Sequence, residues 1–132
     1  MNRIDFLKRI FLGGASLMVA KNMAAKSVEK TDVYLDSPYI AGFQYYKGLQ
    51  LEPHLKQDDT LELKRDPKNK YDRYAVEVSH KTQKLGYLPR TDNKIIARML
   101  DQGLTLKAKI RSINPDAHPY RRVKIRVYSE MG

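Results

Sequence analysis

The sequence predicts one small, mostly β domain, which we expect to be an OB-like or SH3-like β-barrel of about six strands with one or two short helices. From Val33 onward, short stretches of alternating apolar and polar residues are separated by turn-forming residues. One stretch alone, residues 93–101, combines helical spacing of apolar residues with start and stop signals. The chain has 132 residues, which is enough for one compact core after a separate N-terminal segment.

Residues 1–27 differ in character from the rest of the chain. A charged start ending at Arg9 precedes eleven uncharged, mostly apolar residues, 10–20, and small residues follow around Ala24. This is the order of a secretory signal, and residues 8–12 resemble a twin-arginine export signal with Lys8 in place of the first arginine. The apolar run is shorter than the ~20 residues of a transmembrane helix. We expect export or membrane association, with an amphipathic cytoplasmic helix or a basic arm as the alternative.

The first strands of the domain are separated by polar turns. Residues 39–46 are aromatic and β-branched, which predicts a strand that ends at Lys47-Gly48. After a polar loop, residues 61–64 alternate between apolar and polar and predict a second strand. Residues 66–72 contain Asp-Pro and Asn, which favour a turn. Residues 75–78 and 85–88 then predict two strands around a polar link.

The second half predicts a helix and a hairpin. Thr91 or Asp92 can cap a helix over 93–101, and Gly103 can stop it. Residues 104–111 and 122–127 alternate between apolar and cationic residues on either side of a turn. If the apolar residues face the core, the cations share the other face. Those cations are Lys107, Lys109, Arg111, Arg122, Lys124 and Arg126.

The charge of the chain favours an anionic partner. The net charge is +10, and the residues after position 27 keep 20 cations against 14 acids. Such a surplus suits nucleic acid or an anionic membrane surface. Like charges facing each other across two strands repel, so the cationic face of the hairpin either stays solvated or meets a polyanion. The sequence leaves these two interpretations open.

Residue types that carry catalysis are sparse. The absence of cysteine excludes disulfides, thiolate metal sites and thiol nucleophiles. The three histidines lie in predicted loops without metal-type spacing, and no glycine-rich phosphate loop occurs. Asp66 and Asp72 share one turn and could hold Mg²⁺, although turn carboxylates more often accept hydrogen bonds from backbone N–H groups. We therefore expect a binding module rather than an enzyme, with no metal or cofactor.

Tyrosines interleaved with cations form another candidate site. Aromatic rings stack on unpaired bases while nearby cations meet phosphates, although some of these tyrosines could instead belong to the core. The tyrosines are Tyr45, Tyr46, Tyr71 and Tyr87, and the cations are Lys47, Lys64, Lys68, Lys70 and Arg90.

Three segments in this order, Gly42–Gly48, Leu63–Val78 and Leu85–Arg90, resemble the HIRAN domain. The middle segment, with its Arg-Asp-Pro, Asn and Tyr-Asp-x-x-Ala elements, is the most specific. The resemblance runs from about Tyr39 to Arg111, and we expect the domain to span 32–128. It implies a small β-barrel that grips the 3′-hydroxyl end of single-stranded DNA. Family members are often attached to DNA-translocating ATPases or nucleases, and we expect no such catalytic segment here.

The resemblance also implies roles for individual residues. Tyr45 and Tyr46 would help to form the pocket, Tyr71 would contact the terminal nucleotide, and Asp72 would accept a hydrogen bond from the 3′-hydroxyl. Arg90 would meet the backbone phosphate. Two positions depart from the pattern of the eukaryotic end-binders, because Gln44 stands in place of an arginine and Tyr87 in place of a histidine.

The leading hypothesis is a non-catalytic module that binds nucleic acid, preferably single-stranded DNA ends, through these residues and through the hairpin cations Lys107, Lys109, Lys124 and Arg126. The alternative is an exported or membrane-tethered protein whose barrel binds another anionic polymer or a protein in the cell envelope. The N-terminal segment favours the alternative, whereas the motifs favour DNA.

Overall fold

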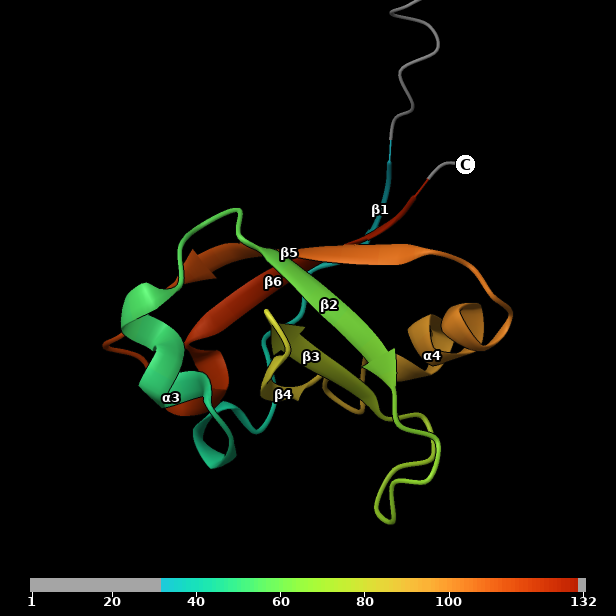
Figure 1. The fold of residues 1–132 in the computed structure, drawn as a ribbon, viewed down its shortest axis with the longest axis horizontal. Helices are drawn as coiled ribbons and strands as arrows, with labels where there is room; N and C mark the ends of the chain where they lie inside the picture. Colours follow the sequence, from blue (N-terminus) through green and yellow to red (C-terminus); the bar gives the residue numbers. More distant parts are fainter. Residues whose placement is uncertain (1–31, 131–132) are drawn as a thin grey trace, which may run out of the picture. The chain divides into compact units, whose positions relative to one another are not determined.

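The computed structural model describes residues 32–130, in which six antiparallel strands form one sheet of order β1-β6-β5-β2-β3-β4 (Figure 1). The segment predicted for residues 1–27 lies outside the described residues. The strands are β1 (Val33–Asp36), β2 (Thr60–Arg65), β3 (Val76–His80), β4 (Gln83–Tyr87), β5 (Leu106–Ile113) and β6 (Val123–Ser129). The helices are α3 (Gly48–Leu51) and α4 (Asn93–Asp101), with 3₁₀ turns η2 (Phe43–Tyr45), η3 (Glu52–His54) and η4 (Pro119–Arg121). The predicted mostly β class is confirmed.

The sheet does not close through a continuous ladder, because its edge strands β1 and β4 are not paired with each other. Residues 38–41 bridge the gap instead. The N–H of Ile40 donates to the carbonyl of Val123 at 2.9 Å on β6. On the other side, Ala41 and Tyr87 exchange two backbone hydrogen bonds of 2.8 and 2.9 Å at β4. The result is a nearly closed barrel in which an irregular segment replaces one strand pairing.

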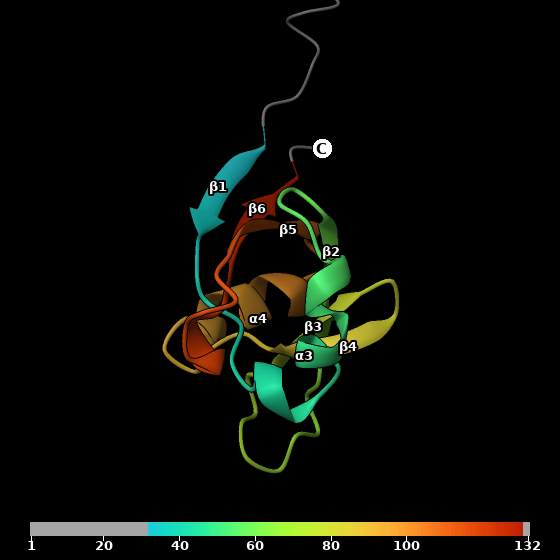
Figure 2. The same cartoon turned by 90° about the vertical axis from the view of Figure 1, so that its left-hand side faces the viewer.

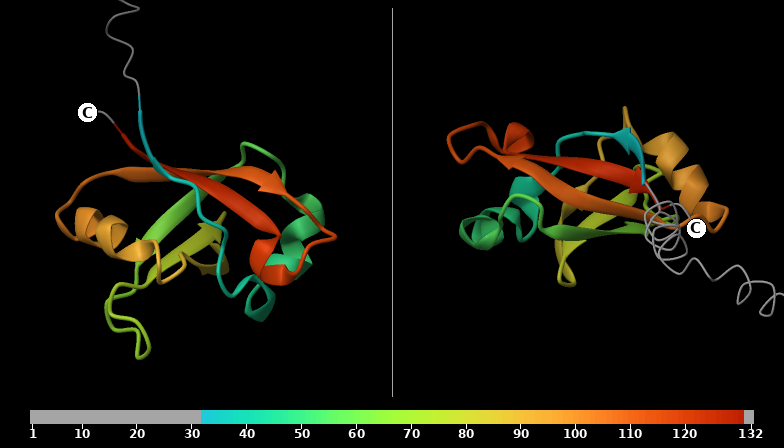
Figure 3. Two further views of the ribbon diagram at one scale, coloured as in Figure 1. Left: turned by 180° about the vertical axis from the view of Figure 1, so that it is seen from behind. Right: turned by 90° about the horizontal axis from the view of Figure 1, so that it is seen from above.

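The barrel encloses a single apolar core that both halves of the sheet share. Seen from two sides, α3 and α4 lie at opposite ends of the barrel, and the β2–β3 loop projects beyond it (Figures 1 and 3). Ile96 and Ala97 bury the inner face of α4 in this core. Within residues 32–130, no helix is long and apolar enough to cross a membrane. The fully buried side chains include Ile40, Phe43, Leu61, Val76, Val78, Leu85, Leu88, Ile110, Val123, Ile125 and Val127.

The prediction of a strand over residues 39–46 is wrong. Tyr39 and Ala41 form only isolated bridges, and the chain then turns through η2 and α3. Gly42 has φ +70°, a left-handed conformation that breaks an extended strand. Gly48 has no side chain, and a methyl group there would lie 2.5 Å from the buried ring of Phe43. The two glycines therefore fold the aromatic segment back onto the core, beside β4 (Figure 2).

The other predicted elements agree with the structure. The helix spans Asn93–Asp101, although Asp92 at its N-cap position makes no side-chain cap hydrogen bond. In the hairpin, Ala108, Ile110, Val123, Ile125 and Val127 face the core, and Leu106 packs against it. The alternation is interrupted at a bulge between Ile110 and Ser112. The alternating pattern thus identified the residues that face the core, but it did not give the strand register of every cation.

Candidate nucleic-acid interface

A pocket of about 220 Å³ lies between the β2–β3 loop, the bridging segment and the end of β4. We call it the end pocket. Five residues predicted for the site come together here, namely Tyr46, Tyr71, Asp72, Tyr87 and Arg90. Its other lining residues are Ala41, Asn69, Ala75 and Leu88.

Tyr45 does not line the end pocket and is 75% exposed. It nevertheless lies beside Tyr46, because a methyl group at Gly42 would be 3.4 Å from the Tyr46 ring and 4.0 Å from that of Tyr45. Gly42 directly follows Ala41 in the pocket wall. Tyr45 is therefore an exposed aromatic ring at the border of the end pocket rather than part of its lining.

Asn69 determines the shape of the β2–β3 loop. Its Oδ1 accepts hydrogen bonds from the backbone N–H groups of Tyr71 at 2.9 Å and Asp72 at 3.1 Å. This Asx-type turn presents Tyr71 outward, with 84% of its surface exposed. Asn69 was predicted as a turn former and as part of the family motif but not as a site residue, and the signal that could have identified its role is the spacing Asn-x-Tyr-Asp.

Asp72 supplies the carboxylate in the lining of the end pocket, and its side chain is 15% exposed. Its Oδ1 accepts a hydrogen bond from the N–H of Tyr74 at 2.9 Å, and its Oδ2 accepts one from Asn93 Nδ2 at 2.6 Å. Arg90 Nε lies 3.9 Å from Oδ2, and the Arg90 side chain is 77% exposed. A carboxylate has about four acceptor positions. Asp72 is therefore fixed in place and can still accept a further hydrogen bond.

Tyr87 forms the rear wall through a polar network that the sequence did not reveal. Its hydroxyl donates to Asp66 Oδ2 at 3.0 Å and accepts from Lys84 Nζ at 2.7 Å. Asn69 Nδ2 also donates to Asp66 Oδ2, at 3.1 Å. Lys84 Nζ lies 4.1 Å from the ring centre of Tyr46 and 4.3 Å from that of Tyr87, within cation–π range. One ammonium group thus holds both tyrosines of the wall.

The same network changes the pKa values of its members. The hydrogen bonds from Asn69 and Tyr87 lower the pKa of Asp66 below its usual value. Burial, together with the hydrogen bond to Asp66, raises the pKa of Tyr87. Burial alone would lower the pKa of Lys84, but the hydrogen bond to Tyr87 and the nearby acceptors outweigh it and raise that pKa. Asp66 therefore stays ionised, and Tyr87 and Lys84 stay protonated, at neutral pH.

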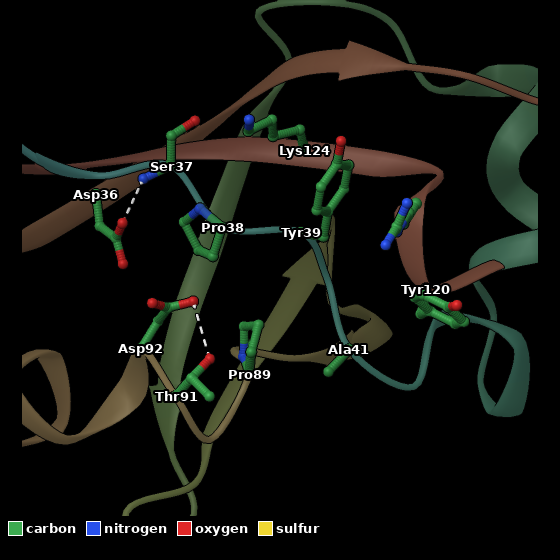
Figure 4. A pocket seen from close by; sticks show the side chains of 11 residues that line it. Asp36, Ser37, Pro38, Tyr39, Ala41, Pro89, Thr91, Asp92, Tyr120 and Lys124 are labelled. Atoms are coloured by element: carbon green, nitrogen blue, oxygen red, sulfur yellow. Dashed lines mark hydrogen bonds between the residues drawn. The ribbon is translucent and has the colours of Figure 1, made fainter. Parts of the chain in front are cut away.

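A larger groove of about 520 Å³ adjoins the end pocket (Figure 4). The two share Ala41, and Pro89 and Thr91 line the groove on either side of Arg90. Tyr39 and Tyr120 project into it, and Lys124 Nζ lies 5.3 Å from the Tyr39 ring centre. Asp36, Ser37, Pro38, Asp92 and Arg121 complete the lining. Lys124 is thus a predicted hairpin cation that lines the groove adjoining the end pocket, and its neighbours Tyr39 and Tyr120 were not among the predicted site residues.

Comparison with known proteins places the fold. The HIRAN domain model matches residues 37–132. The chain belongs to the HIRAN domain family. A crystal structure of a Lactobacillus plantarum protein has the same fold, with a TM-score of 0.68 and 23% identity over 78% of this chain and 99% of that chain. The HIRAN domain of human HLTF aligns with a TM-score of 0.58 and 20% identity over 74% of this chain and 78% of that one. A search of curated proteins found no significant match.

The remaining hairpin cations of this HIRAN domain do not form one continuous site. Lys107 forms an ion pair with Asp32 at 2.7 Å, and this partner raises its pKa. Lys109 and Arg126 lie opposite each other on β5 and β6, away from the end pocket. Arg122 pairs with Glu52 instead of joining the other cations. A separate shallow pocket of about 290 Å³ is lined by Tyr34, Arg111, Arg126 and Tyr128.

Arg122 does not join the cationic face that the alternation predicts. Its Nη1 donates to Glu52 Oε1 at 3.0 Å, and its Nε donates to the carbonyl of Ala117 at 2.9 Å. The Glu52 side chain is only 10% exposed. A buried carboxylate requires a partner. Arg122 therefore neutralises Glu52 at the start of η3 and does not contribute to the cationic face of the hairpin.

Proposed function

We propose that this HIRAN domain is a non-catalytic module that binds nucleic acid, preferably the 3′-hydroxyl end of single-stranded DNA, in the end pocket. The observation that carries the proposal is Asp72. Its carboxylate is held by two hydrogen bonds in the pocket wall and keeps acceptor capacity beside the exposed ring of Tyr71. The family resemblance of the residues from Asn69 to Asp72 supports the same assignment.

Stacking would provide the affinity for the terminal base. Tyr71 and Tyr45 present exposed aromatic faces, and Tyr46 lines the pocket in edge-to-face contact with Tyr87. Base–aromatic stacking contributes about 1–3 kcal/mol per base and depends little on base identity. We therefore expect weak sequence preference at the terminal nucleotide.

Hydrogen bonding would provide the selectivity for an end. A 3′-hydroxyl can donate to the Asp72 carboxylate, whereas a continuing or terminal phosphate would bring negative charge against it. Arg90 is exposed at 3.9 Å from Asp72 and can meet the phosphate on the 5′ side of the terminal nucleotide. Asp72 thus favours a free 3′-hydroxyl, and Arg90 favours the phosphate on the 5′ side of the same nucleotide.

The adjoining groove gives the rest of the strand a path. Tyr39 and Tyr120 offer further stacking faces, while Lys124 and Arg121 supply cations beside those rings. Arg90 stands between the two sites, because its chain neighbours line the groove. A strand that ends in the end pocket would therefore leave it past Arg90 and along the groove.

The test compares three single strands of equal length and sequence: one ending in a 3′-hydroxyl, one ending in a 3′-phosphate and one closed into a circle. Fluorescence anisotropy at fixed salt should rank the hydroxyl strand first by about tenfold or more, because a hydrogen bond to a charged acceptor contributes ~1.5–3 kcal/mol. Equal affinity for all three strands would remove the end preference. Absence of binding to any of them would remove single-stranded DNA as the ligand.

A second candidate function rests on the sequence of residues 1–27, which has the order of a secretory signal. In that case the same cationic and aromatic surfaces would bind another anionic polymer or a protein in the cell envelope. Cell fractionation distinguishes the two functions. Recovery in the envelope fraction supports the second, and recovery with cytoplasmic nucleic acid supports the first.

A further inference from the structure

Three cations lie around the ring of Tyr74, which is two residues after Asp72 in the chain. The charged groups of Arg73, Lys94 and Arg98 lie 5.0, 5.5 and 5.7 Å from the centre of this ring. Arg73 Nη2 also donates to the Tyr74 hydroxyl at 3.0 Å. We call Arg73, Lys94 and Arg98 the basic cluster. None of these three residues was among the predicted site residues.

Asp72 joins the basic cluster physically to the end pocket. Its Oδ1 holds the N–H of Tyr74, and its Oδ2 holds the side chain of Asn93, the residue before Lys94. Arg65 fixes the end of the β2–β3 loop, since its guanidinium donates to the backbone carbonyls of Arg73 at 2.9 Å and Ala75 at 2.6 Å. These contacts fix the backbone that carries the cluster relative to the end pocket.

The basic cluster concentrates positive charge that its surroundings do not neutralise. Within residues 32–130, its three members are exposed and form no ion pair, in contrast to Arg65, which pairs with Asp101 at 2.9 Å. Lys94 and Arg98 are four residues apart on α4, a spacing at which like charges repel. The hydrogen bond from Arg73 and the neighbouring cations lower the pKa of Tyr74. Such a surface is stabilised when an anion binds to it.

We propose that the basic cluster binds the sugar–phosphate backbone of a second nucleic-acid strand, so that the domain holds duplex next to the single-stranded end. The inference rests on the proposed function for the identity of the ligand. None of the three cations lines the end pocket or the groove, along which the strand read by Asp72 would run, so phosphates that contact them would belong to another strand. All three charged groups lie within 5.7 Å of one ring centre, a span that suits two or three neighbouring phosphates.

The test uses three DNA probes: a dumbbell duplex closed at both ends, a duplex with a 3′ single-stranded overhang, and a short single strand with a 3′-hydroxyl. The Lys94→Gln/Arg98→Gln variant is compared with a Lys56→Gln/Lys81→Gln control, which removes the same charge from exposed positions outside the cluster. Each lost phosphate contact should reduce the slope of log affinity against log salt by about 0.9 on duplex. We expect a reduction of about 2 for both duplex probes with the cluster variant.

The control variant should leave those slopes close to the native values, and neither variant should change the affinity for the short single strand. An equal loss on the short single strand would overturn the inference, because the cluster would then serve the strand in the end pocket. Unchanged slopes on the duplex probes would overturn it as well. The dumbbell has no end, so a reduced slope there supports the cluster even if the 3′-hydroxyl preference fails. Thermal unfolding of each variant verifies that the fold is intact.

Discussion

Replacing Asp72 with asparagine tests whether its charge reads the strand end, but the structure shows that this change has two effects. The asparagine Oδ1 can still accept from the N–H of Tyr74, as the native carboxylate does. On the other side, its amide would face the Asn93 amide across a native distance of 2.6 Å, so that two donors oppose each other. Losing a hydrogen bond to a charged group costs ~1.5–3 kcal/mol, so the single variant should lose stability as well as end preference.

The exchange Asp72→Asn/Asn93→Asp separates the two effects. It restores a donor and an acceptor across the same contact but moves the carboxylate to position 93, which is 2% exposed in the native protein. We expect the exchange to recover part of the stability that the single variant loses. The preference for a 3′-hydroxyl over a 3′-phosphate, by contrast, should fall by about ten- to a hundredfold in both variants, as expected for loss of a hydrogen bond to a charged acceptor.

The assay combines urea unfolding with competition between labelled 3′-hydroxyl strands and unlabelled 3′-phosphate strands. The native protein serves as the reference in both measurements. If the exchange variant keeps the native preference for the hydroxyl, the reasoning is refuted, because the charge at position 72 would then play no part in reading the end. If it loses all affinity for strands while remaining folded, the end pocket contributes more than selectivity.

Three further predictions concern the framework of the site. Gly48→Ala should destabilise the domain by about 1–3 kcal/mol in urea unfolding, since the added methyl would lie 2.5 Å from the buried phenylalanine ring; a smaller effect would mean that the ring has room to move. Arg122→Met should cost about 3–5 kcal/mol by leaving its buried glutamate partner unpaired, and replacing both partners with apolar residues should recover most of this loss. Tyr87→Phe should raise the pH of acid unfolding, because Asn69 and Tyr87 lower the pKa of Asp66; the stability from this shift is present above the ordinary pKa of 3.8 and is lost as pH falls through the lower native value. Identical acid-unfolding curves by circular dichroism would contradict the last prediction.

Much of the framework could be predicted because local patterns and tertiary packing agree there. The alternation in residues 106–110 and 123–127 matches the buried face of β5 and β6, and the apolar stripe on residues 93–101 matches α4. The strand prediction for residues 39–46 failed because β-branched and aromatic composition cannot show that Gly42 adopts φ +70°. The turn there depends on how the backbone packs against β4, which is a tertiary property.

The candidate site was predicted by residue type but not by its supporting contacts. Tyr46, Tyr71 and Asp72 meet as expected, whereas Lys84 and Asn93 act from elements distant in the sequence. Their roles arise from contacts across the fold, with Lys84 on β4 facing two tyrosines and Asn93 starting α4 beneath the loop. A single sequence holds no local signal for such pairings.

The most direct measurement is a titration of ¹⁵N-labelled protein with a short single strand carrying a 3′-hydroxyl, followed by two-dimensional NMR. We expect the largest shifts on the backbone N–H groups of Tyr71 and Asp72 and on the side-chain amide of Asn93, which donates to the Asp72 carboxylate. The same strand with a 3′-phosphate should leave the Asn93 amide nearly unmoved. Shifts confined to the region of Lys109 and Arg126 on the β5–β6 face, with the end pocket silent for both strands, would contradict the proposed mode of binding.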